Sequence, residues 1–212
     1  MRTRIEPAAP HAVRALLVIL TVTLFAGCGI FSPDESDPVE GGDDEQQYPL
    51  ATSPAIFVSN FEAAWEDRNL ELYDDLLHEE FVFWLSPQDI DDLGISGSWD
   101  RAREIATAEQ MFGTASDPDL QVQSIEITTL DVVETWTANF DNPNVVGADL
   151  RGTYSVEMSV VFPDRRTNVL GLQNFYLKEV TREIDGVETG VYQLFSWEDL
   201  GVGSVGKRVA AK

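Results

Sequence analysis

The sequence has very little cysteine, histidine and positive charge. Among its 212 residues there is one cysteine, Cys28, and there are two histidines, His11 and His78. So few thiols and imidazoles exclude an internal disulfide framework and a thiolate zinc site, and we expect neither a metal nor a cofactor. The 14 lysines and arginines stand against 37 aspartates and glutamates, for a net charge of -23. Because such a surface repels phosphate groups, we do not expect nucleic acid as a partner.

A long apolar run is also missing at the amino terminus. Arg2, Arg4 and Arg14 precede an uncharged run of 13 residues, 15–27. As a helix this run reaches only ~20 Å, which is short of the ~30 Å of a bilayer core. A basic start and a short apolar run are typical of a signal peptide, which we predict over residues 1–27.

The run ends in a short motif, Leu24-Phe25-Ala26-Gly27-Cys28. It resembles the bacterial lipobox, in which small residues precede a cysteine. The resemblance implies that diacylglycerol alkylates the Cys28 thiol and that cleavage makes Cys28 the new amino terminus. Gly29 is similar to the pattern for outer-membrane sorting, so we expect a lipid anchor in the cell envelope, on the outer membrane facing the periplasm in a two-membrane cell. The alternative is a secretory signal peptide followed by a chance cysteine.

Residues 28–54 are predicted to be the lipidated cysteine and an acidic, disordered tether. The segment is rich in acids and prolines and holds no lysine or arginine. Its apolar content is too low to offset the entropy lost on ordering. Calcium capture or docking to a basic partner is an alternative role for the acids, but solvation explains them without a ligand.

The next part, residues 55–199, is predicted to be one domain. Ile56, Phe57, Phe61, Ala64 and Trp65 recur at helical spacing after the cap Ser53-Pro54. A second helix begins at Asn69 and runs to about His78, and a third covers residues 99–112. Between these two we expect a short strand over residues 81–85 and a loop over residues 87–98.

From residue 120 onward the apolar period changes to two, which predicts strands. We expect them over residues 120–137, with a bend near 130–131, and then over residues 153–162, 169–183 and 191–197. Asp185-Gly186 predicts a hairpin turn, and residues 200–212 are predicted to be a flexible tail with glycine and basic residues.

Helices followed by long hairpin-connected strands predict an α+β fold, with three helices packed on one face of a curved, mainly antiparallel sheet. The element order, with Asn60-Phe61, Trp65 and the segments 73–83 and 192–199, resembles the nuclear transport factor 2-like or SnoaL-like superfamily, a cone-shaped cystatin-like fold. The resemblance implies an apolar pocket, for which we predict the lining residues Trp65, Phe83, Trp84, Tyr154 and Trp197.

That superfamily includes enzymes whose pockets hold a carboxylate or histidine base. The stretch similar to the isomerase base position, residues 83–87, has no carboxylate. Weak candidates for a base are Glu157, Asp131 and His78. Each also has a plain interpretation, because both carboxylates fit a solvated strand face and His78 fits the carboxyl end of a helix.

Two other motifs are incomplete. Residues 89–100 are similar to a calcium loop, but Leu93 occupies a ligand position, and we interpret the segment as a loop ahead of a helix. Residues 201–207 match phosphate-loop spacing until Arg208, where a serine or threonine is needed.

Our leading hypothesis is a lipid-anchored envelope protein with a non-catalytic domain that binds a small apolar ligand or a protein partner, or serves in assembly. The alternative is a SnoaL-like isomerase, cyclase or dehydratase that acts on a small apolar substrate. A third hypothesis is a homodimer formed through the face of the sheet.

Overall fold

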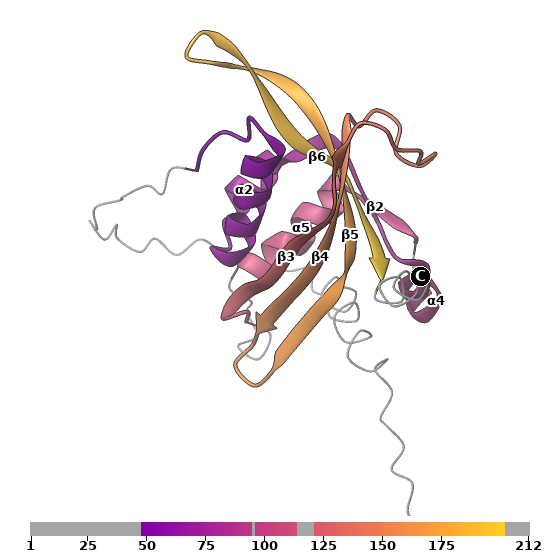
Figure 1. The fold of residues 1–212 in the computed structure, drawn as a ribbon. Coiled ribbons are helices and arrows are strands. Elements are labelled where there is room, and N and C mark those ends of the chain that lie inside the picture. The colour runs from indigo at the N-terminus through magenta and orange to yellow at the C-terminus, as the bar shows by residue number, and fades with distance from the viewer. Residues whose placement is uncertain (1–47, 95, 114–120, 202–212) are drawn as a thin grey trace, which may run out of the picture. The chain divides into compact units, whose positions relative to one another are not determined.

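The computed structural model describes residues 48–94, 96–113 and 121–201 (Figure 1). The predicted signal peptide, Cys28, most of the acidic tether and residues 202–212 lie outside the described part. Within the described part, no helix combines the length and the apolar character that crossing a bilayer requires.

The first two helices begin at the residues expected to cap them. Ser53 accepts a hydrogen bond from the Ile56 backbone N–H at the start of α2 (Pro54–Glu66). Asn69 accepts from the Leu72 N–H at the start of α3 (Leu70–Leu76). Each cap satisfies a backbone donor that the helix itself leaves free. Both predicted helix starts are therefore confirmed.

Three predicted boundaries are wrong between residues 77 and 101. The second helix stops at Leu76, and His78 belongs to strand β1 (Leu77–Trp84). The expected loop contains a short helix, α4 (Pro87–Leu93), which Gly94 ends in a left-handed conformation at φ 62°. Trp99 lies in strand β2 (Ser98–Asp100), because it pairs with Phe83 of the antiparallel strand β1. The third predicted helix, α5 (Arg101–Phe112), therefore starts after β2.

The sheet has six strands in the order β2-β1-β6-β5-β4-β3. The four long strands are β3 (Ser124–Thr137), β4 (Leu150–Val161), β5 (Arg166–Ile184) and β6 (Val187–Gly201). All neighbours are antiparallel except β1 and β6, which are parallel. The register of β3 shifts at several points around the predicted bend. The last two strands are longer than predicted at both ends. They pair with each other up to the Asp185-Gly186 turn, β5 pairs with β4 from Arg166, and β6 pairs with β5 as far as Gly201.

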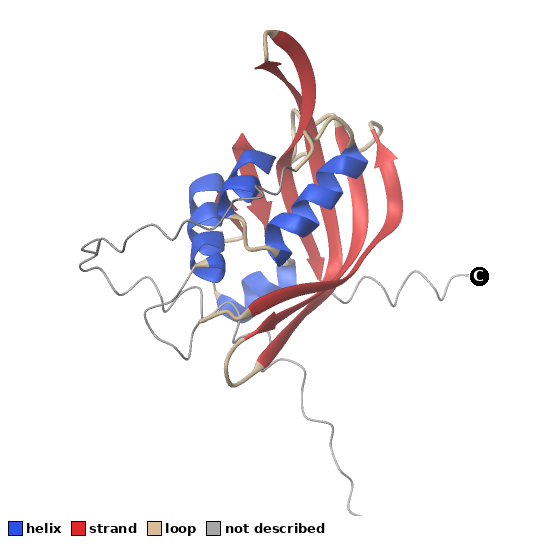
Figure 2. Ribbon diagram, turned by 90° about the vertical axis from the view of Figure 1, so that its left-hand side faces the viewer, coloured by secondary structure: helices blue, strands red, loops and turns tan. Residues whose placement is uncertain are grey.

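The helices α2 and α5 lie on one side of the curved sheet (Figures 1 and 2). We call this side the inner face and the opposite side the outer face. Side chains alternate between the two faces along each strand. Phe175 and Trp197 point inward, toward Phe61 of α2. Their sequence neighbours Tyr176 and Glu198 therefore point outward. The predicted α+β class, with helices on one face of a mainly antiparallel sheet, is confirmed. The predicted number of three helices is wrong, because the described residues form four, α2 to α5.

The domain extends slightly beyond its predicted limits. It begins at Pro49, whose carbonyl oxygen accepts a hydrogen bond of 2.6 Å from the Asn60 side chain. The Ala51 carbonyl accepts one of 2.8 Å from the Tyr192 N–H. At the other end, β6 continues to Gly201. Residues 49–54, which the sequence placed in the tether, therefore belong to the domain.

Candidate functional site

The inner face is filled by a cluster of aromatic rings. Phe61 lies at its centre, with its ring centroid 5.1 Å from that of Phe175 and 5.4 Å from that of Trp197. The Trp65 ring packs edge-on against Tyr73 at 5.3 Å and against Phe112 at 5.2 Å. We call these rings, with Phe57 and Phe83, the inner cluster. Its close edge and tilted contacts are the geometry that aromatic side chains prefer in a packed core.

One buried carboxyl group lies beside the inner cluster. Glu104 of α5 is only 4% exposed. The Tyr73 hydroxyl donates to its Oε1 at 2.6 Å, and the Trp99 Nε1–H donates to its Oε2 at 2.6 Å. Asp100 caps α5 by accepting from the Arg103 N–H, and this start of the helix turns Glu104 toward α3.

The electrostatics of this carboxyl follow from its burial. Burial raises the pKa of Glu104, and the hydrogen bonds from Tyr73 and Trp99 oppose that effect. Burial, followed by the charge of Glu104, raises the pKa of Tyr73 well above its ordinary value. Each oxygen of Glu104 accepts from one donor of the protein, so the carboxyl group holds the Tyr73 hydroxyl and the Trp99 indole in place.

A second polar group lies on the inner face near the end of β6. The Trp197 Nε1–H donates to Gln173 Oε1 at 2.6 Å, and Gln173 Nε2 donates to Asp199 Oδ1 at 3.1 Å. The Gly201 N–H also donates to Asp199 Oδ1, at 2.8 Å. Burial, and then the neighbouring Asp89, raise the pKa of Asp199 to about 6. Asp199 is therefore a group that titrates close to neutral pH.

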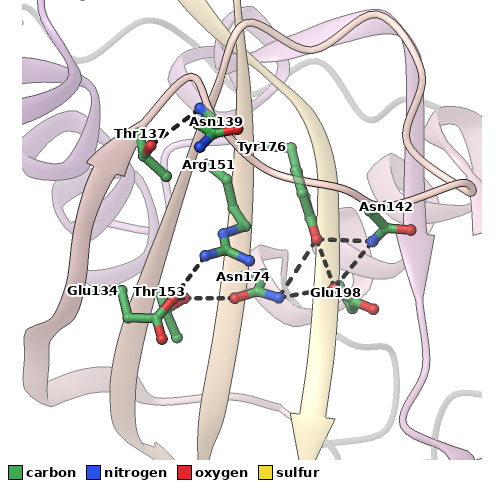
Figure 3. A network of polar contacts seen from close by, with 9 residues as sticks. All are labelled: Glu134, Thr137, Asn139, Asn142, Arg151, Thr153, Asn174, Tyr176 and Glu198. Carbon is green, nitrogen blue, oxygen red and sulfur yellow. Dashed lines mark hydrogen bonds and ion pairs between the residues drawn. The ribbon is translucent and has the colours of Figure 1, made fainter.

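The outer face carries a polar network below the segment 138–149 (Figure 3). Glu198 Oε2 accepts from the Tyr176 hydroxyl at 2.8 Å, from Asn174 Nδ2 at 2.9 Å and from Asn142 Nδ2 at 3.4 Å. Burial raises the pKa of Tyr176 to about 12, so its hydroxyl keeps its proton at neutral pH. The network thereby ties Asn142 to strands β5 and β6.

None of the three candidate bases faces the inner cluster. Glu157 and Asp131 are exposed and lie on the outer face, since each alternates with inward residues of its strand. His78 is buried, but it lies on β1 beside Phe195, and its Nδ1 accepts from the Glu80 N–H. Burial, and then the charge of Lys178, lower its pKa. The inward placement of all three is therefore wrong, and so is the helix-end interpretation of His78.

Four of the five predicted pocket residues share the inner face. Trp65 and Phe83 each contact the Trp197 ring, at 6.3 Å and 5.1 Å, and Tyr154 contacts Phe175 at 5.5 Å. Trp84 is the exception. It stands beside Glu198 in the parallel pairing of β1 with β6, and so lies on the outer face. Grouping Trp84 with the other four is wrong, and whether the four line a pocket stays a prediction.

Glu104, Gln173 and Asp199 stand in no motif that predicts a site from the sequence. A glutamate inside an amphipathic helix is usually solvated, so Glu104 carried no signal of burial. Among the residues that the structure describes, no three His, Cys, Asp or Glu side chains gather as ligands for a metal ion.

No protein-family model matches the sequence, and no curated protein is significantly similar to it. The domain is similar in fold to solved structures of nuclear transport factor 2-like proteins. One, of unknown function in nutrient uptake from Rhodospirillum rubrum, is 10% identical, with 71% of this chain and 98% of that chain covered and a TM-score of 0.41. Another, of unknown function from Burkholderia pseudomallei, is 11% identical, with 74% and 97% covered and a TM-score of 0.43. An LEH-like epoxide hydrolase from M. tuberculosis is 14% identical, with 68% and 77% covered and a TM-score of 0.39.

These similarities concern the arrangement of the elements and carry no information on activity. Such folds host many unrelated functions, so function has to be argued from the residues of this chain.

Proposed function

We propose that this protein is a lipid-anchored envelope protein whose domain binds a ligand or a partner without catalysing a reaction. The observation that carries the non-catalytic part is Glu104, whose two carboxylate oxygens are both engaged by Tyr73 and Trp99 beside a packed aromatic cluster. A general base must lie within hydrogen-bond reach of its substrate. Glu104 instead faces Tyr73 and Trp99, and each of its oxygens holds one of these two donors in place.

The lipid anchor rests on Cys28 and the small residues before it. We expect the full chain, expressed in a bacterium that processes lipoproteins, to sediment with membranes and to carry diacylglycerol on Cys28. Cys28→Ser is expected to abolish both, because the thiol is the only group that the lipid can occupy there. Ser32→Ala, four residues later, is the matched control and should leave sedimentation unchanged. An unmodified, membrane-free wild-type chain, found by mass spectrometry, would contradict the proposal.

The enzyme alternative makes a different prediction. We expect the purified chain to turn over ketosteroid-type and polyketide-type substrates no faster than buffer, whereas a positioned acid or base is worth ~10²–10⁴ in rate. The measurement is product formation by wild type, Glu104→Gln and Asp199→Asn, with the exposed Glu157→Gln as control. Turnover that disappears in Glu104→Gln or Asp199→Asn but survives in Glu157→Gln would establish the SnoaL-like enzyme instead.

A further inference from the structure

The hairpin of β5 and β6 projects beyond the rest of the sheet (Figure 1). The pairing of β4 with β5 ends at Leu177, and the pairing of β1 with β6 begins at Leu194. Within the described part of the chain, residues 178–193 therefore pair as strands only with each other. We call these residues the arm. Both of its sides are sheet edges, to which an extended chain can add a strand.

Two contacts at the base of the arm show which of its backbone groups point outward. The Glu179 N–H donates to Asp149 Oδ2 at 2.8 Å, and the Tyr192 N–H donates to the Ala51 carbonyl at 2.8 Å. Glu179 and Tyr192 face each other across the arm. Because hydrogen-bonded and non-hydrogen-bonded pairs alternate along an antiparallel ladder, every second residue beyond them also turns its backbone outward. On β5 these residues are Thr181 and Glu183, whose backbone no described residue outside the arm contacts by a hydrogen bond.

The outward residues of β5 also form an acidic row. Glu179, Thr181 and Glu183 are exposed and lie on one face of the arm, because side chains alternate along a strand. Glu183 stands directly opposite Glu188, in a non-hydrogen-bonded pair, where side chains come closest. Like charges in such a pair are destabilising. No ion pair among the described residues includes any of these glutamates. Positive charges supplied from outside the arm would therefore relieve the repulsion.

A segment with matching charges follows the described residues. Residues 202–212 hold three basic residues and no acidic one. Two of the basic residues, Arg208 and Lys212, would lie on the same face of an extended strand, because side chains alternate with a period of two. They are spaced along the chain in the same way as Glu179 and Glu183. A strand formed by this segment therefore matches the acidic row in charge and in spacing.

The reach of residues 202–212 decides which copy of the chain can supply this strand. From Gly201 back to Glu188, which is opposite Glu183, β6 measures about 43 Å along the strand. Residues 202–212 span at most about 39 Å when fully extended. They would also have to pass round β4, because Glu183 is on the side of β5 that faces away from β6. The segment of the same chain therefore falls short of Glu183.

We propose that residues 207–212 of one copy add a strand to the β5 edge of the arm in a second copy, with Arg208 and Lys212 beside Glu179 and Glu183. The added strand pairs with the outward backbone groups of the arm, and its two cations offset the acidic row. The contact names a partner for the proposed binding function, on which it rests, at a surface outside the inner cluster. Its failure would leave the lipid anchor and the non-catalytic inner face unaffected.

Sedimentation of the purified full chain in detergent tests the charge match. The wild type is expected to self-associate over a series of concentrations. Both Glu179→Lys/Glu183→Lys and Arg208→Glu/Lys212→Glu should weaken this association roughly tenfold or more, because attraction becomes repulsion. An equal mixture of the two double variants should form a complex again, since one still offers the basic segment and the other still offers the acidic arm.

The matched control changes the same charge elsewhere. Glu71→Lys/Glu109→Lys replaces two exposed acids of the helices and should associate like the wild type. A wild type that stays monomeric, double variants that associate as strongly as the wild type, or a mixture that forms no complex would each overturn the proposal. Protection of residues 207–212 that does not depend on protein concentration would also overturn it, because the segment would then bind within its own chain.

A proline tests the backbone pairing separately from the charges. Thr181→Pro removes an N–H that points outward and leaves the hydrogen bonds between β5 and β6 in place. It should weaken the association roughly tenfold or more, whereas Thr181→Val keeps the N–H and should associate like the wild type. Equal association of the two variants would contradict the addition of a strand at this edge.

Discussion

Trp65→Ala is expected to lower the free energy of unfolding by about 3–5 kcal/mol, the usual cost of removing a large buried aromatic side chain. Trp65 is 5% exposed and contacts Phe61, Tyr73, Phe112 and Trp197 through its ring. The surrounding rings come from three helices and the sheet, so they cannot close together over the space that the indole leaves. Denaturant melts of wild type and variant would measure the loss.

Trp84→Ala is the matched control for this experiment. It removes the same side chain from a half-buried position on the outer face, outside the inner cluster. We expect a smaller loss, because less apolar surface returns to water and no ring cluster is opened. A larger loss for Trp84→Ala than for Trp65→Ala would contradict the assignment of the core to the inner face.

The second large effect is expected at Glu104. Glu104→Ala leaves the buried Tyr73 hydroxyl and the part-buried Trp99 indole N–H without their acceptor. A fully buried orphaned group costs about 1–3 kcal/mol, and a part-buried one costs less because water can reach it. We therefore expect a loss of roughly 2–5 kcal/mol in unfolding free energy. Glu109→Ala changes an exposed glutamate of the same helix and should cost little. Equal losses for the two variants would mean that the Glu104 hydrogen bonds contribute nothing to stability.

Glu104→Gln adds a test of the electrostatics. Burial raises the pKa of Glu104 above 4.5, so the folded state holds its proton more tightly than the unfolded state. The contribution of Glu104 to stability is then greatest below pH 4.5 and is lost as the pH rises through the folded-state value. Glutamine does not titrate, so the gap in stability between wild type and Glu104→Gln should be widest in acid and narrow as the pH rises. Denaturant melts at a series of pH values would measure this difference in unfolding free energy. A difference that widens as the pH rises would contradict a raised pKa of Glu104.

Residues close together in the chain were sufficient to predict most of the helices and strands. Ser53 and Asn69 cap helices because their side chains accept from the backbone a turn later, which depends on near neighbours only. The Asp185-Gly186 turn takes positive φ at both residues, which that pair tolerates better than most. The register between β4 and β5 likewise follows from alternating apolar residues on strands close in sequence.

The candidate site could not be found in this way, because its partners are far apart in the chain. Tyr73 and Glu104 are separated by 31 positions, and their contact depends on how α3 and α5 pack. Alternation places Phe83 and Trp84 on opposite faces, but it does not say which face the helices cover. Only the parallel pairing of β1 with β6, between residues more than 100 positions apart, decides that Phe83 is inside.

By itself, the sequence determined the helix caps, the strand periodicity, the α+β class and the expectation of a lipid on Cys28, because each depends on residues that are neighbours along the chain. Tertiary structure alone decided that Glu104 is buried, that Glu157 and Asp131 point away from the inner cluster, and that Asp199 accepts a hydrogen bond from Gln173. The physical reason is that burial and proton affinity depend on what surrounds a side chain in space. A carboxyl group in water and one beside an aromatic core are written with the same letter in the sequence. Ionisation costs more free energy in the core, because the charged group loses its contact with water.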